Sequence, residues 1–327
     1  MRIPLRRIGV YCIAFLFAIV MNFAVPRLMP GSPVDGMIAQ LGQRATPAAI
    51  EAIKARFGAI QQPVWEQFVD YIKGLAVLDL GVSVKYYPQT VTEVLGRSAG
   101  WTAFLIVTAI IFSLCVGVTL GAVAAWRRGG RFDAFVSPFS VVLIAVPPVI
   151  VALATLFIFG VSFRWFPVGY AYDPDLDPGI NFTFIGSVFY HAIMPVLTLS
   201  PYLIGEFQTT MRSSMISVLG EDYVTMGRAK GLSEAAVMFG YAARNAMLPV
   251  LTNLALILGA VFGGSIVTEI VFNYPGLGLT LFTASVARDY PVIQGQLLLM
   301  TLATLGANLL VDILYGVIDP RIRERHA

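Results

Sequence analysis

The stretch Trp101–Ala125, WTAFLIVTAIIFSLCVGVTLGAVAA, contains no charged residue over 25 positions. A helix needs about 20 consecutive apolar residues to cross a bilayer, so this stretch is long enough to span one. The whole chain agrees with that interpretation, because 57% of its 327 residues are hydrophobic, only 13% are charged and the mean hydropathy is +0.77. Soluble domains carry about 25% charged residues. We therefore predict an integral membrane protein.

Five further segments are mainly apolar over about 18 residues or more and predict five further spans. They are Ile8–Val25, Ala134–Phe163, Ile185–Ile204, Met247–Thr268 and Val292–Val311. Backbone groups cannot stay unpaired in hydrocarbon, so each span should be a helix. The predicted fold class is an all-α integral membrane protein with six transmembrane helices. We expect four prolines within these segments to bend their helices: Pro147, Pro148, Pro195 and Pro201.

The positions of Lys and Arg predict the orientation of the spans. Basic residues precede the first span, follow the sixth, and fill the connections between the second and third and between the fourth and fifth: Arg2, Arg6, Arg7, Arg127, Arg128, Arg131, Arg212, Arg228, Lys230, Arg244, Arg321, Arg323 and Arg325. The short loops on the opposite side carry only Arg164 and Arg288. We therefore expect both termini in the cytoplasm. The net charge of +3 is too small and dispersed to indicate a nucleic-acid partner.

The N-terminus has an alternative interpretation as a cleaved secretory signal, because MRIPLRR is basic and an apolar run follows it. That run is long for a signal, and no small-x-small cleavage site follows, so we expect an uncleaved first helix. Cys12 and Cys115 both lie within spans, and we expect two buried thiols with no disulfide and no metal site.

The outer segment between the first two spans, residues 30–97, is too long for a simple connection. Thr46 and Pro47 form a helix start before AAIEAIKARF, and Gly58 is a plausible end. A second helix is predicted in QPVWEQFVDYIKGL, whose apolar residues share one face: Val64, Trp65, Phe68, Val69, Ile72 and Leu75. That face either rests on the membrane surface or caps the helix bundle where a soluble partner binds. The predicted division is 1–29, 30–97 and a core of 98–327.

A polar stretch, EDYVTMGRAKGLSEAAVMFGYAARNAMLP at residues 221–249, interrupts the apolar core on the predicted cytoplasmic side. It divides into two short helices joined at Gly231, a residue suited to the left-handed conformation that ends a helix. Ser233 can cap the second helix, with Leu232 before it as a hydrophobic staple. Such an elbow either inserts into a groove on another protein or lies on the inner leaflet. The sequence pattern alone leaves both possibilities open.

AKGLSEAAVMFGYAARNAMLPV resembles the cytoplasmic coupling loop of ABC importer permeases, and most of all the dipeptide, oligopeptide and nickel permease group. Five further segments, distributed over nearly the whole chain, also resemble this permease group: QPVWEQFVDYIKGLAVLDLGVS, RNAMLPVLT, TEIVFNYPGLG, RDYPVIQG and DILYGVIDPRIR. Two positions depart from the pattern. Thr225 occupies the glutamate position of the general signature, and Leu78 precedes the DLG where that group often has glycine.

The resemblance implies one transmembrane half of a binding-protein-dependent importer in a prokaryotic inner membrane. A second, similar permease would form a heterodimer with it, two cytoplasmic ATPases would bind ATP and Mg, and an extracytoplasmic binding protein would deliver the solute. The coupling loop would be residues 212–246, with contacts to the ATPases from Glu221, Asp222, Ala229, Lys230, Gly231, Leu232, Ser233 and Glu234. The chain contains no GxxxxGK[ST] phosphate loop, so we expect no cofactor of its own. Peptides are the expected substrates, with oligosaccharides or nickel as alternatives.

Three polar residues are candidates for the translocation pathway: His191, Asn253 and Glu269. An interhelical hydrogen bond is the alternative explanation for His191 and Asn253, and Glu269 can simply reach the interface at the end of its span. A gradient-driven secondary transporter would place carboxylates at mid-membrane in two repeated halves, a pattern that this sequence lacks. Neither a metal-ligand cluster nor a Ser-His-Asp arrangement is visible, so we expect no enzyme activity.

Overall fold

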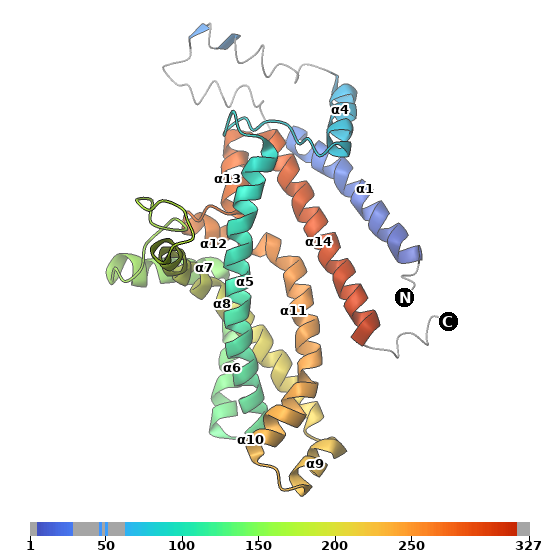
Figure 1. The fold of residues 1–327 in the computed structure, drawn as a ribbon, viewed down its shortest axis with the longest axis vertical. Helices are drawn as coiled ribbons and strands as arrows, with labels where there is room; N and C mark the ends of the chain where they lie inside the picture. Colours follow the sequence, from blue (N-terminus) through green and yellow to red (C-terminus); the bar gives the residue numbers. More distant parts are fainter. Residues whose placement is uncertain (1–4, 29–45, 48–49, 52–62, 319–327) are drawn as a thin grey trace. The chain divides into compact units, whose positions relative to one another are not determined.

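The computed structural model describes residues 5–28, 46–47, 50–51 and 63–318, and these ranges are predominantly helical (Figure 1). The chain divides into two compact units. Unit 1 comprises residues 1–102 and 275–306, and unit 2 comprises residues 103–274 and 307–327. The helix expected over AAIEAIKARF lies almost wholly outside the described residues. Only its first turn is visible, where the Ile50 N–H donates to the Thr46 carbonyl oxygen over 3.0 Å.

Unit 1 contains α1 (Leu5–Leu28), α4 (Val64–Ala76), the beginning of α5 (Val91–Trp126), α13 (Leu277–Ala287) and the first part of α14 (Tyr290–Ile318). The predicted amphipathic helix is confirmed as α4, which packs beside the end of α1 (Figure 1). The rings of Phe23 and Phe68 meet edge to face at 5.0 Å. Arg27 Nε donates to Gln67 Oε1 over 3.0 Å. The apolar face is covered only in part, because Trp65 remains 68% exposed.

A buried carboxylate joins the segment after α4 to the start of α14. Asp289 is fully buried, and its Oδ2 accepts hydrogen bonds from Ser83 Oγ and from the Lys85 N–H, the latter over 2.9 Å. Its Oδ1 accepts from the Val292 N–H over 3.3 Å, as a residue before a helix does. Two segments that are distant in sequence, DLGVS and RDYPVIQG, are therefore held together within unit 1.

Unit 2 contains the remainder of α5 and seven elements before α11: α6 (Arg131–Ala145), α7 (Pro148–Thr155), η3 (Leu156–Ser162), α8 (Phe182–Val218), α9 (Asp222–Ala229), α10 (Glu234–Ala236) and η4 (Val237–Ala243). The last two helices within residues 103–274 of unit 2 are α11 (Arg244–Gly264) and α12 (Ile266–Val271). The bend expected at Pro147 and Pro148 is confirmed, because α6 and the helix from Pro148 to Ser162 differ in direction by 96°. Pro195 and Pro201 lie inside α8, which remains one helix of 37 residues.

Glycines allow the backbones of α5, α6 and α8 to approach closely in unit 2. A Cβ added at Gly121 of α5 would lie 2.6 Å from the carbonyl oxygen of Gln208 in α8. A Cβ at Gly117 would lie 2.8 Å from the Ile204 carbonyl oxygen, and one at Gly205 would lie 2.7 Å from the Ser140 carbonyl oxygen in α6. Small residues at such contacts are typical of helices that pack within a membrane.

We expect Gly121→Ala to lower the free energy of unfolding by about 1–3 kcal/mol, because the new methyl group meets backbone and forces α5 away from α8. Thermal unfolding of the purified protein in detergent measures the change. Gly100→Ala on the same helix is the control, since a Cβ there meets nothing within 4 Å and alanine favours the helix by about 1 kcal/mol. Equal unfolding temperatures for Gly121→Ala and Gly100→Ala would contradict the close approach of α5 to α8.

The number of membrane spans stays a prediction. Three helices within the described ranges are long and apolar enough to cross a membrane: Gly9–Leu28, Val91–Trp126 and Phe182–Val218. The bent pair of helices from Arg131 to Ser162 makes a fourth if it is counted as one span. The segments expected to form the fifth and sixth spans are helical, as α11 and α14.

The expected burial of the two cysteines is wrong. Cys12 on α1 and Cys115 on α5 are both exposed on the surface of the chain, and neither forms a disulfide. Hydropathy places a thiol within an apolar helix, but it does not say which side of that helix packs against the rest of the protein.

Candidate functional site

The polar stretch between α8 and α11 forms an elbow, here defined as residues 221–236. Its glycine has the predicted left-handed conformation: Gly231 has φ +73°, and its N–H donates to the Arg228 carbonyl oxygen over 2.9 Å. The predicted cap is also confirmed, because Ser233 Oγ accepts from the Ala236 N–H over 3.3 Å. One turn therefore ends α9 and starts the next helix within four residues.

The second helix of the elbow is not short, and this part of the prediction is wrong. After α10 the chain continues without interruption through the π-helix η4 into α11, so that residues 234–264 form one helical run. The π-type turns accommodate an extra residue without ending the helix. On the other side, α8 extends to Val218, beyond the expected loop boundary at residue 212. The elbow is therefore attached directly to two long helices.

The inner side of the elbow is packed. Val224 of α9 and Val237 of η4 are fully buried. Gly227 faces the ring of Tyr241, because a Cβ added there would lie 3.6 Å from that ring, an ordinary contact distance. The Arg228 guanidinium lies over the Trp126 ring at the end of α5, 5.1 Å from its centroid. These contacts fix α9 against its neighbours.

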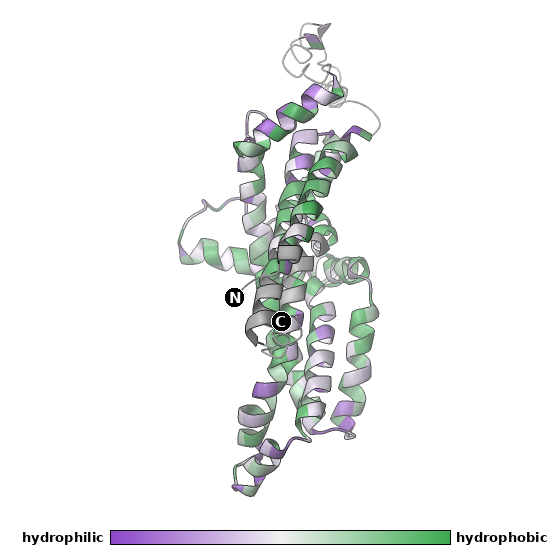
Figure 2. Cartoon of the chain, turned by 90° about the vertical axis from the view of Figure 1, so that its right-hand side faces the viewer, coloured by the Kyte–Doolittle hydropathy of each residue, from purple (hydrophilic) through white to green (hydrophobic). Residues whose placement is uncertain are grey.

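The outer side of the elbow is exposed, and it contains all eight residues that the sequence analysis assigned to coupling. They are Glu221, Asp222, Ala229, Lys230, Gly231, Leu232, Ser233 and Glu234. Large apolar side chains are exposed beside these charges: Met226, Leu232 and Phe239. Hydrophilic residues gather at this end of unit 2, whereas the helices that lead to it are mainly apolar (Figure 2). The surface thus combines apolar and charged groups in the way that protein interfaces do.

An ion pair that the sequence analysis missed lies beside the elbow, and we call it the Asp133–Arg212 clamp. Arg212 Nε and Nη2 donate to the two carboxylate oxygens of Asp133 over 2.6 and 2.9 Å. Asp133 is 6% exposed and also accepts from the Gly129 N–H and Ser137 Oγ. The clamp joins the start of α6 to the part of α8 that leads to the elbow. The sequence contains one indication of this ion pair: Asp133 is the only acidic residue between Ala125 and Ala134.

The three candidates for the translocation pathway lie on three different helices of unit 2. Asn253 on α11 donates from Nδ2 to Thr210 Oγ1 of α8 over 3.3 Å, so the expected interhelical hydrogen bond is confirmed. For His191 that expectation is wrong, because its Nδ1 lies 2.9 Å from the Ser187 carbonyl oxygen of its own helix. Glu269 on α12 lies inside unit 2. It is 0% exposed and accepts from Ser265 Oγ over 2.7 Å.

The chain is similar to membrane transport components over most of its length. Residues 117–324 match the family described as binding-protein-dependent transport system inner membrane component. The chain is 34% identical to the di/tripeptide transport system permease protein DppB of Pseudomonas aeruginosa (strain UCBPP-PA14), with 98% of each chain covered. The same values hold for the dipeptide transport system permease protein DppB of Escherichia coli (strain K12). A putative peptide permease protein of Brucella suis biovar 1 is 34% identical over 93% of each chain.

Proposed function

The chain belongs to the family of binding-protein-dependent transport system inner membrane components, and we propose that it is the permease subunit of an ABC importer that moves di- or oligopeptides. It is a transport component and not an enzyme. The observation that carries the substrate class is the full-length similarity to peptide permeases from several bacteria. Oligosaccharides and nickel remain the alternative substrates.

We propose that the elbow is the site where a cytoplasmic ATPase binds this chain. Its exposed apolar and charged residues suit insertion into a groove of a partner protein. The ATPase subunits would bind ATP and Mg, which supply the energy. A second, homologous permease would complete the pathway as a heterodimer, and a binding protein would deliver the peptide on the opposite side. Both termini would lie in the cytoplasm with the elbow.

The length of α8 supports transmission of movement from the elbow into the membrane. A helix of 37 residues is about 55 Å long, whereas the hydrocarbon core of a bilayer is about 30 Å thick. One end of α8 can therefore extend beyond the membrane as a stiff rod, held by the Asp133–Arg212 clamp. When ATP binding closes the ATPases, the elbow would move as a rigid body and open the permease pair outward; hydrolysis would reset it.

The proposal is tested by reconstitution of the chain in liposomes with its second permease, its ATPases and its binding protein. Uptake of a labelled dipeptide, a labelled oligosaccharide and Ni²⁺ is measured with and without ATP. We expect dipeptide uptake that requires ATP and the ATPases. Solute uptake by liposomes that contain the permeases alone would disprove the assignment as an ABC importer, and ATP-dependent uptake of only the sugar or the metal would disprove the substrate.

We expect Leu232→Asp to weaken ATPase binding about fivefold, because an exposed apolar contact of about 1 kcal/mol is replaced by a charge. Co-purification of the ATPase at graded concentrations, or surface plasmon resonance, measures the affinity. Phe182→Asp is the matched control, since Phe182 is also exposed but begins α8 at the end opposite to the elbow. If the Leu232→Asp protein binds the ATPase as tightly as the wild type does, Leu232 is not part of the interface.

A further inference from the structure

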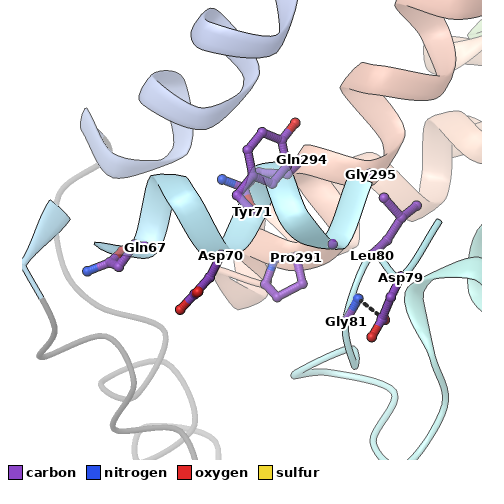
Figure 3. Close-up of a pocket in the computed structure, with 10 residues that line it drawn as sticks. Gln67, Asp70, Tyr71, Asp79, Leu80, Gly81, Pro291, Gln294 and Gly295 are labelled. Atoms are coloured by element: carbon purple, nitrogen blue, oxygen red, sulfur yellow. Dashed lines mark hydrogen bonds between the residues drawn. The ribbon is translucent and has the colours of Figure 1, made fainter. Parts of the chain in front are cut away.

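Helix α4 of unit 1 has one packed side and one charged side. On the packed side, the ring of Phe23 in α1 lies 5.0 Å from the ring of Phe68 and 5.7 Å from that of Tyr71, measured between centroids. The charged side is exposed and consists of Glu66, Asp70 and Lys73. Figure 3 shows the side chains of Asp70 and Tyr71 pointing in opposite directions from α4. The charged side therefore faces away from the contact with α1.

A third side of α4 is apolar and largely uncovered. Its residues recur at the spacing of one helical face: Trp65, Val69, Ile72 and Ala76. The apolar surface continues past the end of the helix, where Val77 is 74% and Leu78 is 83% exposed. We call these six residues the apolar stripe. The described part of the chain leaves most of this stripe without a covering element, although the helix beside it packs well on α1.

Leu78 has a backbone conformation that favours glycine, with φ +57°. It ends α4 in a Schellman turn, in which the Leu78 N–H donates to the Leu75 carbonyl oxygen over 3.2 Å and the Asp79 N–H to that of Gly74 over 2.9 Å. The next turn is fixed by the bond from the Gly81 N–H to Asp79 Oδ1 (Figure 3). A left-handed leucine is strained, because its Cβ crowds the following carbonyl oxygen. An apolar medium around the chain would offset this strain by covering the exposed side chain.

Two cavities indicate which medium each side of α4 faces. A pocket of about 290 Å³ borders the charged side, and its lining includes Asp70 and Asp79. A groove of about 570 Å³ borders the apolar stripe, because Ile72, Ala76 and Leu78 line it. The other walls of this groove come from α1, α5 and α14 and are mainly apolar: Phe15, Ile19, Leu95 and Leu298. Since α1 and α5 are long and apolar enough to cross a membrane, the stripe continues the surface of membrane-spanning helices.

We propose that α4 lies in the outer lipid–water interface and anchors the outer segment there, with the apolar stripe among lipid acyl chains and the charged side in water. Trp65 suits this position, because tryptophan is enriched at membrane interfaces. The groove favours lipid over a soluble partner. It extends to Phe15 and Ile19, in the middle of the span Gly9–Leu28, a depth that a soluble protein does not reach. The anchor is independent of the elbow and of the transported substrate.

The test uses nitroxide labels on the full-length chain, purified with its subunits and placed in nanodiscs of phosphatidylethanolamine and phosphatidylglycerol. Cys12 and Cys115 are first replaced by alanine, because both are exposed. Single labels are then attached on the stripe, at Ile72→Cys or Leu78→Cys, or on the charged side, at Lys73→Cys. Electron paramagnetic resonance measures collisions with oxygen, which dissolves in lipid, and with a nickel chelate, which stays in water. We expect the oxygen-to-nickel ratio to be several-fold higher on the stripe than on the charged side.

Ile72→Glu and Lys73→Glu form a matched pair, because they introduce the same residue at adjacent positions on different sides of α4. With the label at Leu78→Cys, we expect Ile72→Glu to increase collisions with nickel and Lys73→Glu to leave them unchanged, although Lys73→Glu changes the charge more.

Three results with the labelled but otherwise unchanged stripe would overturn the proposal. Equal ratios on both sides of α4 would show that the helix lies wholly in water or wholly in lipid. Shielding of the stripe labels from oxygen and nickel alike would show that another protein, such as the second permease, covers the stripe. Stripe labels that collide with nickel and become immobile when the binding protein is added would show a docking surface for that soluble partner.

Discussion

Asp133→Ala is expected to lower the free energy of unfolding by about 3 kcal/mol, because it leaves the Arg212 guanidinium without the carboxylate that accepts two of its hydrogen bonds. Removal of one partner of a buried ion pair costs about 3–5 kcal/mol. The loss lies at the lower end of this range because the Arg212 side chain is 28% exposed and water can reach it. The N–H of Gly129 and the hydroxyl of Ser137 also lose their acceptor. Thermal or denaturant unfolding in detergent measures the loss.

Two comparisons separate the clamp from a general effect of charge. Asp177→Ala removes an exposed carboxylate of unit 2 and should change stability by less than about 0.5 kcal/mol. The double variant of Asp133 and Arg212 should lose less than the sum of the two single variants, because removal of both charges leaves neither unpaired. Strict additivity, or an Asp133→Ala protein as stable as Asp177→Ala, would show that the clamp does not stabilise the fold.

The elbow could be predicted from sequence because its determinants are local. The left-handed turn at Gly231 and the cap by Ser233 depend on residues within three positions of each other. The clamp could not be predicted in this way, because Asp133 and Arg212 are 79 positions apart. Likewise, Ser83 and Asp289 are 206 positions apart. Contacts of this kind depend on how the helices pack, and the hydropathy pattern of each helix does not specify its neighbours.

The polar residues of the spans illustrate the same distinction. A polar side chain in an apolar helix needs a partner, and that rule correctly predicted the bond from Asn253 to α8. The rule does not say which partner is nearest, so His191 instead bonds to the carbonyl oxygen of Ser187 one turn earlier in its own helix. For Glu269 the sequence left two interpretations open, a place in the translocation pathway or a position at the membrane interface near the end of its span. Its burial follows from the orientation of the short helix α12, which the sequence pattern does not determine.

Gly231→Val is expected to reduce ATP-driven transport about tenfold or more while the protein still folds. A β-branched residue in the left-handed region costs about 1–2 kcal/mol, and about 1.4 kcal/mol corresponds to a factor of ten in an equilibrium. The turn would relieve this strain by changing its backbone angles, which alters the angle between α9 and the helical run of residues 234–264. Folding should survive, because a Cβ at Gly231 meets nothing within 4 Å.

The measurements are ATP-dependent dipeptide uptake and ATP hydrolysis in the same proteoliposomes, and we expect hydrolysis to continue while uptake falls. Gly231→Asn should retain most of the uptake, since asparagine tolerates the left-handed conformation far better than valine does. Gly240→Val is the second control, because Gly240 is exposed within η4, has no positive φ and leaves space for a Cβ. If the Gly231→Val protein takes up dipeptide as fast as the Gly231→Asn protein, the left-handed turn has no role in coupling. If Gly240→Val lowers uptake as much as Gly231→Val does, the defect comes from the loss of a glycine and not from the turn. Only a loss of uptake that is specific to Gly231→Val supports the elbow as a rigid connection between ATPase and membrane.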